Sequence, residues 1–396
     1  MNPICLYNGT VMTGFAAMEH CAVLVEDGLV ADVFSQKRFD QKHFGPEVRI
    51  IDVQESYIAP GFIDTHVHGF GGYGTEDAFE SPQKGTDSIL EMSRILAQYG
   101  VTSFNPTIFP TEPGLLLQAV KAASDAMGRE EGARIMGLHL EGPFISTERL
   151  GMQRAEGVMA VDLSFMEKLW EAAQGKIVNM TVAPELKGMR ELALYCIKKG
   201  VILQAGHTDA EYENMVEGMQ AGILHSTHLF NAMRRLDHRN PNAVGAILIH
   251  PEMSCEIIAD GFHVHPDLYK LLLRDKPVNK IVMVTDALKP AEQKEGPFFA
   301  NDEEVVFHGG VFHRKSDDVI SGSCLTMIKG IENLVTFGFS LEDAVKTAST
   351  NPAQVMRYSG KGAIIPGHDA DLTVFSKDYR ILMVLIGGRI IREKIT

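Results

Sequence analysis

Residues 58–69 read IAPGFIDTHVHG, an apolar segment that Pro60-Gly61 interrupts and that ends in two histidines. The apolar residues predict a buried β-strand. His66 and His68 are separated by one residue, so their side chains point to the same face of that strand. Two imidazoles on one face at a strand end are arranged as the chelation of a single metal ion requires.

Strand-like and helix-like segments alternate from this point onward. Most of the apolar segments are separated by residues with helical periodicity, such as 86–100. Eight strands that alternate with helices predict an α/β fold, a (β/α)8 barrel of the TIM type. The expected strands lie within 58–69, 101–108, 134–143, 176–186, 201–209, 223–233, 254–266 and 280–290.

The two ends of the chain have a different pattern. Short β-like segments near the N-terminus are separated by turns at Asn8-Gly9 and Asp27-Gly28, and residues 370–391 are similar. Neither end contains enough strands for a sheet of its own. We therefore expect a small β-sandwich domain built from residues 1–57 and 360–396, with the barrel domain, residues 58–359, inserted between them.

The composition limits the classes of function. The chain has 396 residues, 45% of them hydrophobic, and its formal net charge of −14 argues against a nucleic-acid-binding protein. We find no apolar run of about 18 residues that would span a membrane, and no secretory signal. The five cysteines form no CxxC pair, which argues against a disulfide framework. We expect a cytoplasmic protein that binds neither nucleic acid nor membranes.

Histidines and carboxylates recur where the predicted barrel strands end. A single histidine at a strand end is usually structural, but the carboxyl ends of all barrel strands meet at the active-site mouth. Imidazole and carboxylate suit Zn²⁺, Fe²⁺ or Mn²⁺, of which we expect Zn²⁺. His225 faces away from His228 in its strand and is interpreted as structural. The expected metal site comprises His66, His68, Glu141, His207, His228 and Asp286.

Short motifs support a more specific interpretation. The chain contains, in order, PGFIDTHVHG, HLEGPF, AGHTDA, THLFNAM, ADGFHVHP, VTDA, SGSCLTM and NPAQV. This order resembles that of the amidohydrolase superfamily. HLEGP, THLFNAM and DGxHxHP together resemble the N-acetylglucosamine-6-phosphate deacetylase family within it. The resemblance extends over nearly the whole chain and implies one or two divalent ions per subunit.

The resemblance also implies roles for individual residues. Asp286 matches the catalytic acid/base, which would take a proton from the attacking water and pass one to the departing amine. The first ion would be held by Glu141, His207 and His228, and the optional second ion by His66 and His68 with Glu141 as the bridge and Asp286 as a further candidate ligand. The implied substrate-binding residues are Gln153, Asn231, Ala232, Arg239, His263, Ile320 and Ser321.

Two of these positions carry further implications. Arg239 matches a phosphate-binding arginine that reaches the site from the neighbouring subunit, which implies a homodimer. Gln153 stands where many members of the family have a histidine in the loop that meets the substrate. Glutamine can hydrogen-bond a sugar hydroxyl or the acetyl carbonyl, but it carries no charge.

The expected function is hydrolysis of the acetamide of N-acetyl-D-glucosamine 6-phosphate to glucosamine 6-phosphate and acetate. The nearest alternative is the same reaction on N-acetylgalactosamine 6-phosphate, which differs at one hydroxyl. A second alternative is another amidohydrolase reaction, such as a deamination, on the same barrel. A third is a superfamily member without catalytic activity, against which the complete set of ligand residues argues.

Overall fold

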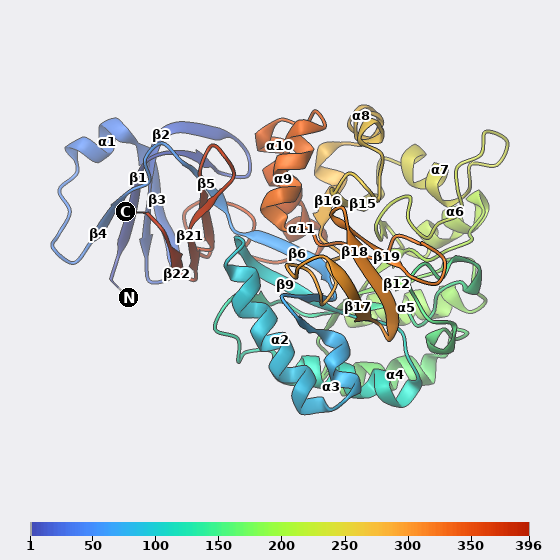
Figure 1. Ribbon diagram of the computed structural model, residues 1–396. Coiled ribbons are helices and arrows are strands. Elements are labelled where there is room, and N and C mark those ends of the chain that lie inside the picture. The colour runs from blue at the N-terminus through green and yellow to red at the C-terminus, as the bar shows by residue number, and fades with distance from the viewer. Residues whose placement is uncertain (1, 396) are drawn as a thin grey trace.

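Parallel strands form a nearly closed barrel in the computed structural model, which describes residues 2–395. The backbone N–H of Asp286 donates to His66 O at 2.9 Å and that of His68 to Ala287 O at 3.0 Å, which joins the last strand to the first. The predicted (β/α)8 barrel is confirmed (Figure 1). Its strands are β6 (Phe62–Val67), β9 (Val101–Ile108), β11 (Leu138–Glu141), β12 (Ile177–Val182), β13 (Ile202–Ala205), β14 (His225–Ser226), β15 (Ser254–Ile258) and β16 (Ile281–Val284), with β10 (Arg134–Ile135) beside β9.

Helices surround the barrel, and α2 (Pro82–Ala97) shows how one of them buries a single face. Helix α2 begins after Ser81, whose hydroxyl accepts a hydrogen bond from the Lys84 N–H. Its buried face includes Ile89, Met92 and Leu96, as the periodicity of the sequence predicts. The other helices of this region are α3 (Pro113–Ala126), α4 (Leu163–Ala172), α5 (Met189–Lys199), α6 (Tyr212–Gln220), α7 (Asn242–Ile249), α8 (Pro266–Asp275), α9 (Met327–Thr336), α10 (Leu341–Ala348) and α11 (Thr350–Val355).

Strands from both ends of the chain share one further sheet. C-terminal β20 (Leu372–Phe375) pairs antiparallel with N-terminal β5 (Tyr57–Pro60), and β5 lies beside β1 (Ile4–Met12), so both termini lie in the same region of the molecule (Figure 1). The sheet folds around its own apolar core, which confirms the expected β-rich unit. The elements are β1 (Ile4–Met12), β2 (Ala17–Glu26), β3 (Leu29–Ser35), α1 (Gln36–Gln41), β4 (Arg49–Asp52), β5 (Tyr57–Pro60), β20 (Leu372–Phe375), β21 (Ile381–Ile386) and β22 (Arg389–Glu393).

The chain changes from the terminal sheet to the barrel at Gly61. The Gly61 N–H donates to Asp371 O at 2.8 Å. A Cβ atom on Gly61 would lie only 2.1 Å from Thr102 Oγ1, so the close approach of β9 requires glycine. Residues 58–60, which we expected at the start of the barrel strand, therefore pair in the terminal sheet as part of β5, and β6 begins at Phe62.

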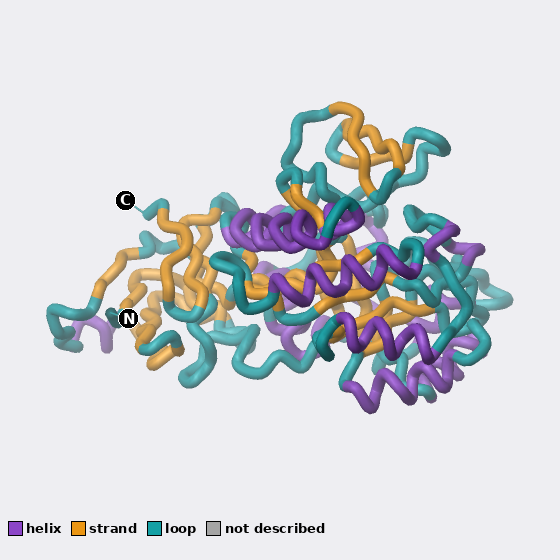
Figure 2. The backbone as a smooth tube through the Cα atoms, turned by 90° about the horizontal axis from the view of Figure 1, so that it is seen from below, coloured by secondary structure: helices purple, strands orange, loops and turns teal. Residues whose placement is uncertain are grey.

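An insertion between β16 and α9 was not predicted from the sequence. It forms a three-stranded antiparallel sheet of β17 (Gly296–Ala300), β18 (Glu303–His308) and β19 (Val311–Arg314). The insertion projects from the barrel (Figure 2). Asn301 attaches it, because its N–H donates to Glu76 Oε2 at 2.7 Å and its side-chain amide to Met152 O at 3.2 Å. A small hairpin of β7 (Gly69–Phe70) and β8 (Tyr73–Gly74) follows β6.

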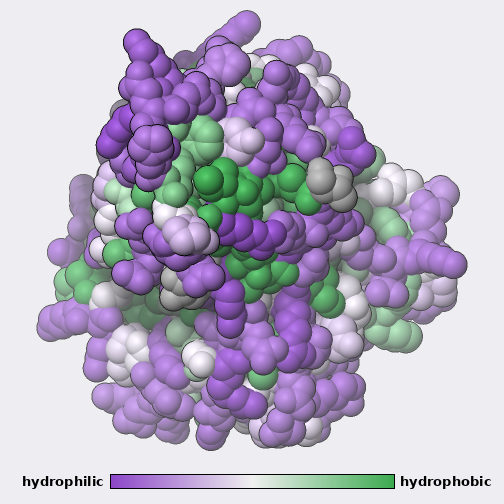
Figure 3. All heavy atoms as spheres, turned by 90° about the vertical axis from the view of Figure 1, so that its left-hand side faces the viewer, coloured by the Kyte–Doolittle hydropathy of each residue, from purple (hydrophilic) through white to green (hydrophobic). Residues whose placement is uncertain are grey.

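The surface on the side of the terminal sheet is mainly hydrophilic, with an apolar area near its middle (Figure 3). Within residues 2–395, the helices are all too short or too polar to cross a membrane.

Candidate active site

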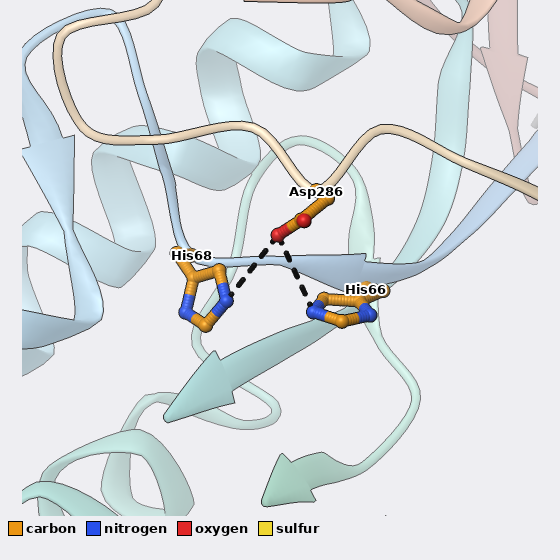
Figure 4. A group of neighbouring side chains, drawn as sticks. All are labelled: His66, His68 and Asp286. Carbon is orange, nitrogen blue, oxygen red and sulfur yellow. Dashed lines mark ion pairs between the residues drawn. The ribbon is translucent and has the colours of Figure 1, made fainter. Parts of the chain in front are cut away.

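His66, His68 and Asp286 form the first of two groups of potential metal ligands. His66 lies in β6 and His68 just after it, while Asp286 lies in the loop that follows β16 (Figure 4). The Nε2 atoms of both histidines lie 3.4 Å from Asp286 Oδ1. The spacing of the two histidines and the closure of the barrel together place three ligand atoms at one point.

Glu141, His207 and His228 form the second group, from the ends of three other strands. Both histidine Nε2 atoms lie 3.0 Å from Glu141 Oε1. Glu141 also contacts the first group, because its Oε2 lies 3.1 Å from His68 Nε2 and its Oε1 lies 3.4 Å from His66 Nε2. The two groups therefore share one carboxylate, in the position of a bridge.

Hydrogen bonds at the Nδ1 atoms of His207 and His66 leave the Nε2 lone pair of each ring facing the cluster of ligand residues. His207 Nδ1 lies 3.0 Å from Arg149 O, and a carbonyl only accepts hydrogen bonds, so the proton is on Nδ1. The Nε2 atom of the neutral ring then carries a lone pair that faces Glu141. His66 has the same arrangement, with Nδ1 3.0 Å from Glu256 Oε2. Its Nε2 atom is buried and has no hydrogen-bond partner among the described residues.

The electrostatics of the cluster suit a divalent cation. Burial disfavours a charge on Glu141, but the surrounding histidines outweigh it and hold the pKa of Glu141 well below its usual range. Burial would likewise lower the pKa of His66, but Asp286, Glu141 and Glu256 outweigh it and raise that pKa well above its usual value. Anionic carboxylates therefore draw positive charge to this position. Imidazole nitrogens and carboxylate oxygens are the ligands that Zn²⁺ and Fe²⁺ bind, so the residues fit the expected ion.

Several site residues have an unfavourable backbone conformation. His207, His228, Ala232 and Asp286 have φ values of 46°, 21°, 49° and 50°. A non-glycine residue in this left-handed region costs about 1–2 kcal/mol, and such residues cluster at functional sites. The turns that follow the strands therefore hold these side chains in place at a cost in stability.

The two ligand groups open into a cavity of about 350 Å³. Its volume lies within the range for sites that bind small molecules. His66 lies beneath the cavity wall and is fully buried. The predicted site residues that line the cavity are His68, Glu141, Gln153, His207, His228, Asn231, Ala232, His263, Asp286 and Ile320.

His263 faces this cavity and is oriented by Asp260. Its Nδ1 atom lies 2.6 Å from Asp260 Oδ2. Burial opposes a positive charge on His263, but the hydrogen bond and charge of Asp260 outweigh it and raise the pKa of His263. The arrangement presents a hydrogen-bond donor with positive charge to an anionic ligand.

Gln153, Ser321 and Arg239 lie at different places relative to the cavity. Gln153 lies deep in the cavity, where its side-chain amide donates to Glu141 Oε2 at 2.5 Å. Ser321 is buried beside the cavity, and its N–H donates to Phe312 O at 3.0 Å. Arg239 is exposed on the loop before α7 and does not line the cavity of its own chain. The roles of all the predicted site residues, Ser321 and Arg239 included, stay predictions.

Sequence reasoning did not single out Glu256, which contacts His66 from behind. The side chain is fully buried in β15. A carboxylate within the buried strand SCEII was the available signal, because a buried charge requires a partner. His139, by contrast, bonds Thr107 Oγ1 and Thr181 Oγ1 at 3.0 Å each, so both of its ring nitrogens are satisfied away from the cluster.

Comparisons with known proteins agree with this geometry. The amidohydrolase family model matches residues 57–391. The N-acetylglucosamine-6-phosphate deacetylase of Bacillus subtilis (strain 168) is 32% identical over 386 residues, which are 96% of this chain and 95% of that protein. The crystal structure of the deacetylase of that name from Pasteurella multocida superposes with a TM-score of 0.90 at 25% identity, covering 98% of this chain and 99% of the other.

A second solved structure carries a ligand. It is a mutant N-acetyl-D-glucosamine-6-phosphate deacetylase from Mycobacterium smegmatis in complex with N-acetyl-D-glucosamine-6-phosphate. It superposes with a TM-score of 0.89 at 26% identity and covers 99% of this chain and 100% of that chain. The similarity to these proteins thus includes the terminal sheet as well as the barrel.

Proposed function

Because this chain belongs to the amidohydrolase family, we propose that it is a metal-dependent deacetylase of N-acetyl-D-glucosamine 6-phosphate. The products would be glucosamine 6-phosphate and acetate. The observation that carries the proposal is the sharing of Glu141 by two ligand groups that open into one cavity. The deacetylase relatives, which match nearly the full chain, support the choice of substrate.

One or two divalent ions, Zn²⁺ by preference and Fe²⁺ or Mn²⁺ as alternatives, would be held by the residues of the cluster. Glu141, His207 and His228 would hold the first ion, and His66 and His68 the second. A bound ion supplies Lewis acidity, which polarises an amide carbonyl and favours ionisation of water. The buried Nε2 lone pairs of His66 and His207 support this assignment.

Asp286 would move the protons of the reaction. Its carboxylate lines the same cavity as Glu141, where the water that attacks the acetamide carbon would lie. The carboxylate takes one proton from this water as the new carbon–oxygen bond forms. It then returns the proton to the nitrogen as the carbon–nitrogen bond breaks, because an amine leaves poorly unless it is protonated.

The remaining cavity residues would bind the sugar phosphate. Asn231, the Ala232 N–H and His263 would contact its polar groups, and Gln153 a hydroxyl or the acetyl carbonyl. Backbone groups of Ile320 and Ser321 would complete the wall below the insertion. Arg239 would bind the phosphate group of the substrate held in the neighbouring subunit, since its guanidinium forms paired hydrogen bonds with phosphate oxygens. This last role makes the active form a homodimer.

The choice of substrate is tested by incubating the metal-replete protein with each candidate sugar. The acetate and ammonia formed from that sugar are then measured. We expect acetate alone, with a higher kcat/KM for N-acetylglucosamine 6-phosphate than for the galacto epimer or for N-acetylglucosamine without phosphate. Release of ammonia, or equal rates with and without the phosphate, would contradict the proposal. A higher kcat/KM for the galacto epimer would change the sugar but leave the reaction.

The dimer is tested with two inactive variants. Arg239→Ala and Asp286→Asn subunits would each form dimers with little activity. A mixed dimer would contain one intact site, with Asp286 from one subunit and Arg239 from the other. Equal mixing and exchange should therefore restore about a quarter of wild-type activity. Mixtures that stay inactive, although native mass spectrometry shows mixed dimers by the mass difference between the two substitutions, would place Arg239 outside the partner's site. The cytoplasmic location stays a prediction.

A further inference from the structure

We infer that Glu256 is a positioning residue that holds both groups of metal ligands from outside the cavity. The inference deepens the proposed function and rests on its metal site. Glu256 lies in β15 and its side chain is fully buried. It does not line the cavity, so it has no contact with a substrate.

Glu256 determines which nitrogen of His66 faces the cluster. Its Oε2 atom lies 3.0 Å from His66 Nδ1. An anionic carboxylate only accepts hydrogen bonds, so the ring proton is held on Nδ1. The Nε2 lone pair is then directed at the point between Glu141 Oε1 and Asp286 Oδ1, each 3.4 Å away. A carboxylate behind a ligating histidine also raises the basicity of that ligand.

The same carboxylate contacts the second group through the backbone. The His228 N–H donates to Glu256 Oε2 at 3.3 Å, and beside it the Leu229 N–H donates to the backbone carbonyl of Glu256 at 2.8 Å, a bond that does not involve the carboxylate. His228 has a φ of 21°, which few non-glycine residues adopt, so these bonds help to hold a strained turn. Gln204 Nε2 donates to the other oxygen, Oε1, at 3.2 Å and fixes the carboxylate itself.

One buried carboxylate therefore couples His66 of the first group to His228 of the second. A buried anion is costly unless its hydrogen bonds are satisfied and its charge is compensated. Its contacts with Gln204 and the backbone satisfy the first condition. A cation on the far side of the His66 ring would satisfy the second. Loss of Glu256 should thus weaken metal binding without removing a ligand.

The test measures the binding of Zn²⁺ to metal-free protein by competition with a chromophoric chelator. Substitution of a residue that orients a ligating histidine typically lowers metal affinity about 10–100-fold, and we expect this for Glu256→Gln. Glu252→Gln is the matched control, because that carboxylate lies in the turn before β15 with its side chain 52% exposed. It should bind Zn²⁺ as wild type does.

Glu256→Asp separates position from charge. Aspartate keeps the negative charge but is shorter by one methylene, so it would not reach His66 Nδ1. Affinity as low as that of Glu256→Gln would support a positioning role. Wild-type affinity in both variants would overturn it, and so would wild-type affinity in Glu256→Asp alone, because charge without contact would then suffice.

A double-mutant cycle with His66→Asn assigns part of the effect to His66. If Glu256 acts through His66, Glu256→Gln should weaken Zn²⁺ binding less in the His66→Asn protein than in wild type. Equal losses in both backgrounds would overturn the coupling. Wild-type protein that binds Zn²⁺ but releases no acetate would contradict the proposed function alone, and the affinities would still decide the role of Glu256.

A measurement on wild type covers the case in which the Glu256 variants do not fold. ¹⁵N-histidine NMR distinguishes the two ring tautomers, and His66→Asn identifies the His66 signals. In the Zn²⁺-loaded protein we expect a proton on His66 Nδ1. A proton on Nε2 would overturn the inference, because Glu256 would then not set the tautomer.

Discussion

The Nε2 atoms of His207 and His228 lie 3.1 Å apart. The hydrogen bond from His207 Nδ1–H to Arg149 O leaves a lone pair on its Nε2 atom. Both Nε2 atoms also lie 3.0 Å from Glu141 Oε1, so three basic atoms converge on one point. Such a convergence of electron pairs is stable only with a cation or proton at its centre.

Replacement of a ligand in this group should remove both metal and activity. His207→Asn keeps a polar side chain but shortens it, and loss of metal catalysis worth several kcal/mol corresponds to a fall in kcat of at least about 100-fold. The variant should also lose the rise in Tm that Zn²⁺ gives to metal-free wild type. Metal analysis, Tm and kcat check this expectation. His308→Asn is the control, since His308 is 82% exposed. Full activity of His207→Asn would exclude the group as the catalytic centre.

Asp286→Asn should lower kcat while metal still binds. Asparagine cannot accept the proton of the attacking water, and removal of a general acid/base typically costs about 10²–10⁴-fold in rate. Glu141, His207 and His228 are unchanged, so the protein should retain at least one ion per subunit by metal analysis. Asp267→Asn, at a side chain 71% exposed, should behave as wild type. An unchanged kcat for Asp286→Asn would assign the proton transfer to another residue.

The pair of Asp260 and His263 should stabilise the fold mainly at mildly acidic pH. Burial opposes charge on each, but the partner outweighs it, so the pKa of His263 is raised and that of Asp260 is lowered. The stabilisation is complete between about pH 4 and pH 6.5, the unfolded values of aspartate and histidine. It is lost as pH falls through the folded pKa of Asp260 or rises through that of His263.

A double-mutant cycle with Asp260→Asn and His263→Asn measures this interaction by urea unfolding. A buried hydrogen bond between charged groups is worth about 1.5–3 kcal/mol, which we expect at about pH 5.5. The coupling free energy should be smaller at about pH 9, because a rise in pH favours loss of the positive charge on His263. A coupling that does not change between these two pH values would show that His263 stays in one protonation state.

Gly61→Ala should destabilise the junction between the terminal sheet and the barrel. The new Cβ would lie 2.1 Å from Thr102 Oγ1 and 2.6 Å from Thr102 Cβ, so β6 and β9 would have to separate. Overpacking of this kind costs about 1–3 kcal/mol in the free energy of unfolding, which chemical denaturation measures.

The comparison for this prediction is Gly114→Ala in α3. A Cβ atom there would have no atom within 4 Å, and alanine favours helix by up to about 1 kcal/mol over glycine. Gly114→Ala should therefore be neutral or stabilising. Equal effects of the two substitutions would show that β9 moves aside without cost.

Most of the fold could be predicted from local patterns in the sequence. The parity of His66 and His68 and the period of α2 depend on neighbouring residues, so each could be predicted without coordinates. The insertion of β17, β18 and β19 lies outside the repeating strand–helix pattern, and its composition did not reveal it. The end of β5 at Pro60 also escaped prediction, because the apolar residues continue into β6 and only pairing with β20 separates them.

The sequence by itself determined the types of ligand and the strand ends that carry them. It also determined that both termini are β-rich, since alternation along a strand is a local property. Only the tertiary structure decided that Glu141 contacts four histidines and that Glu256 lies behind two of them. These contacts join residues far apart in the chain, and they exist only once β16 closes against β6. The curvature of a closed barrel, rather than any one motif, brings the strand ends to a common point.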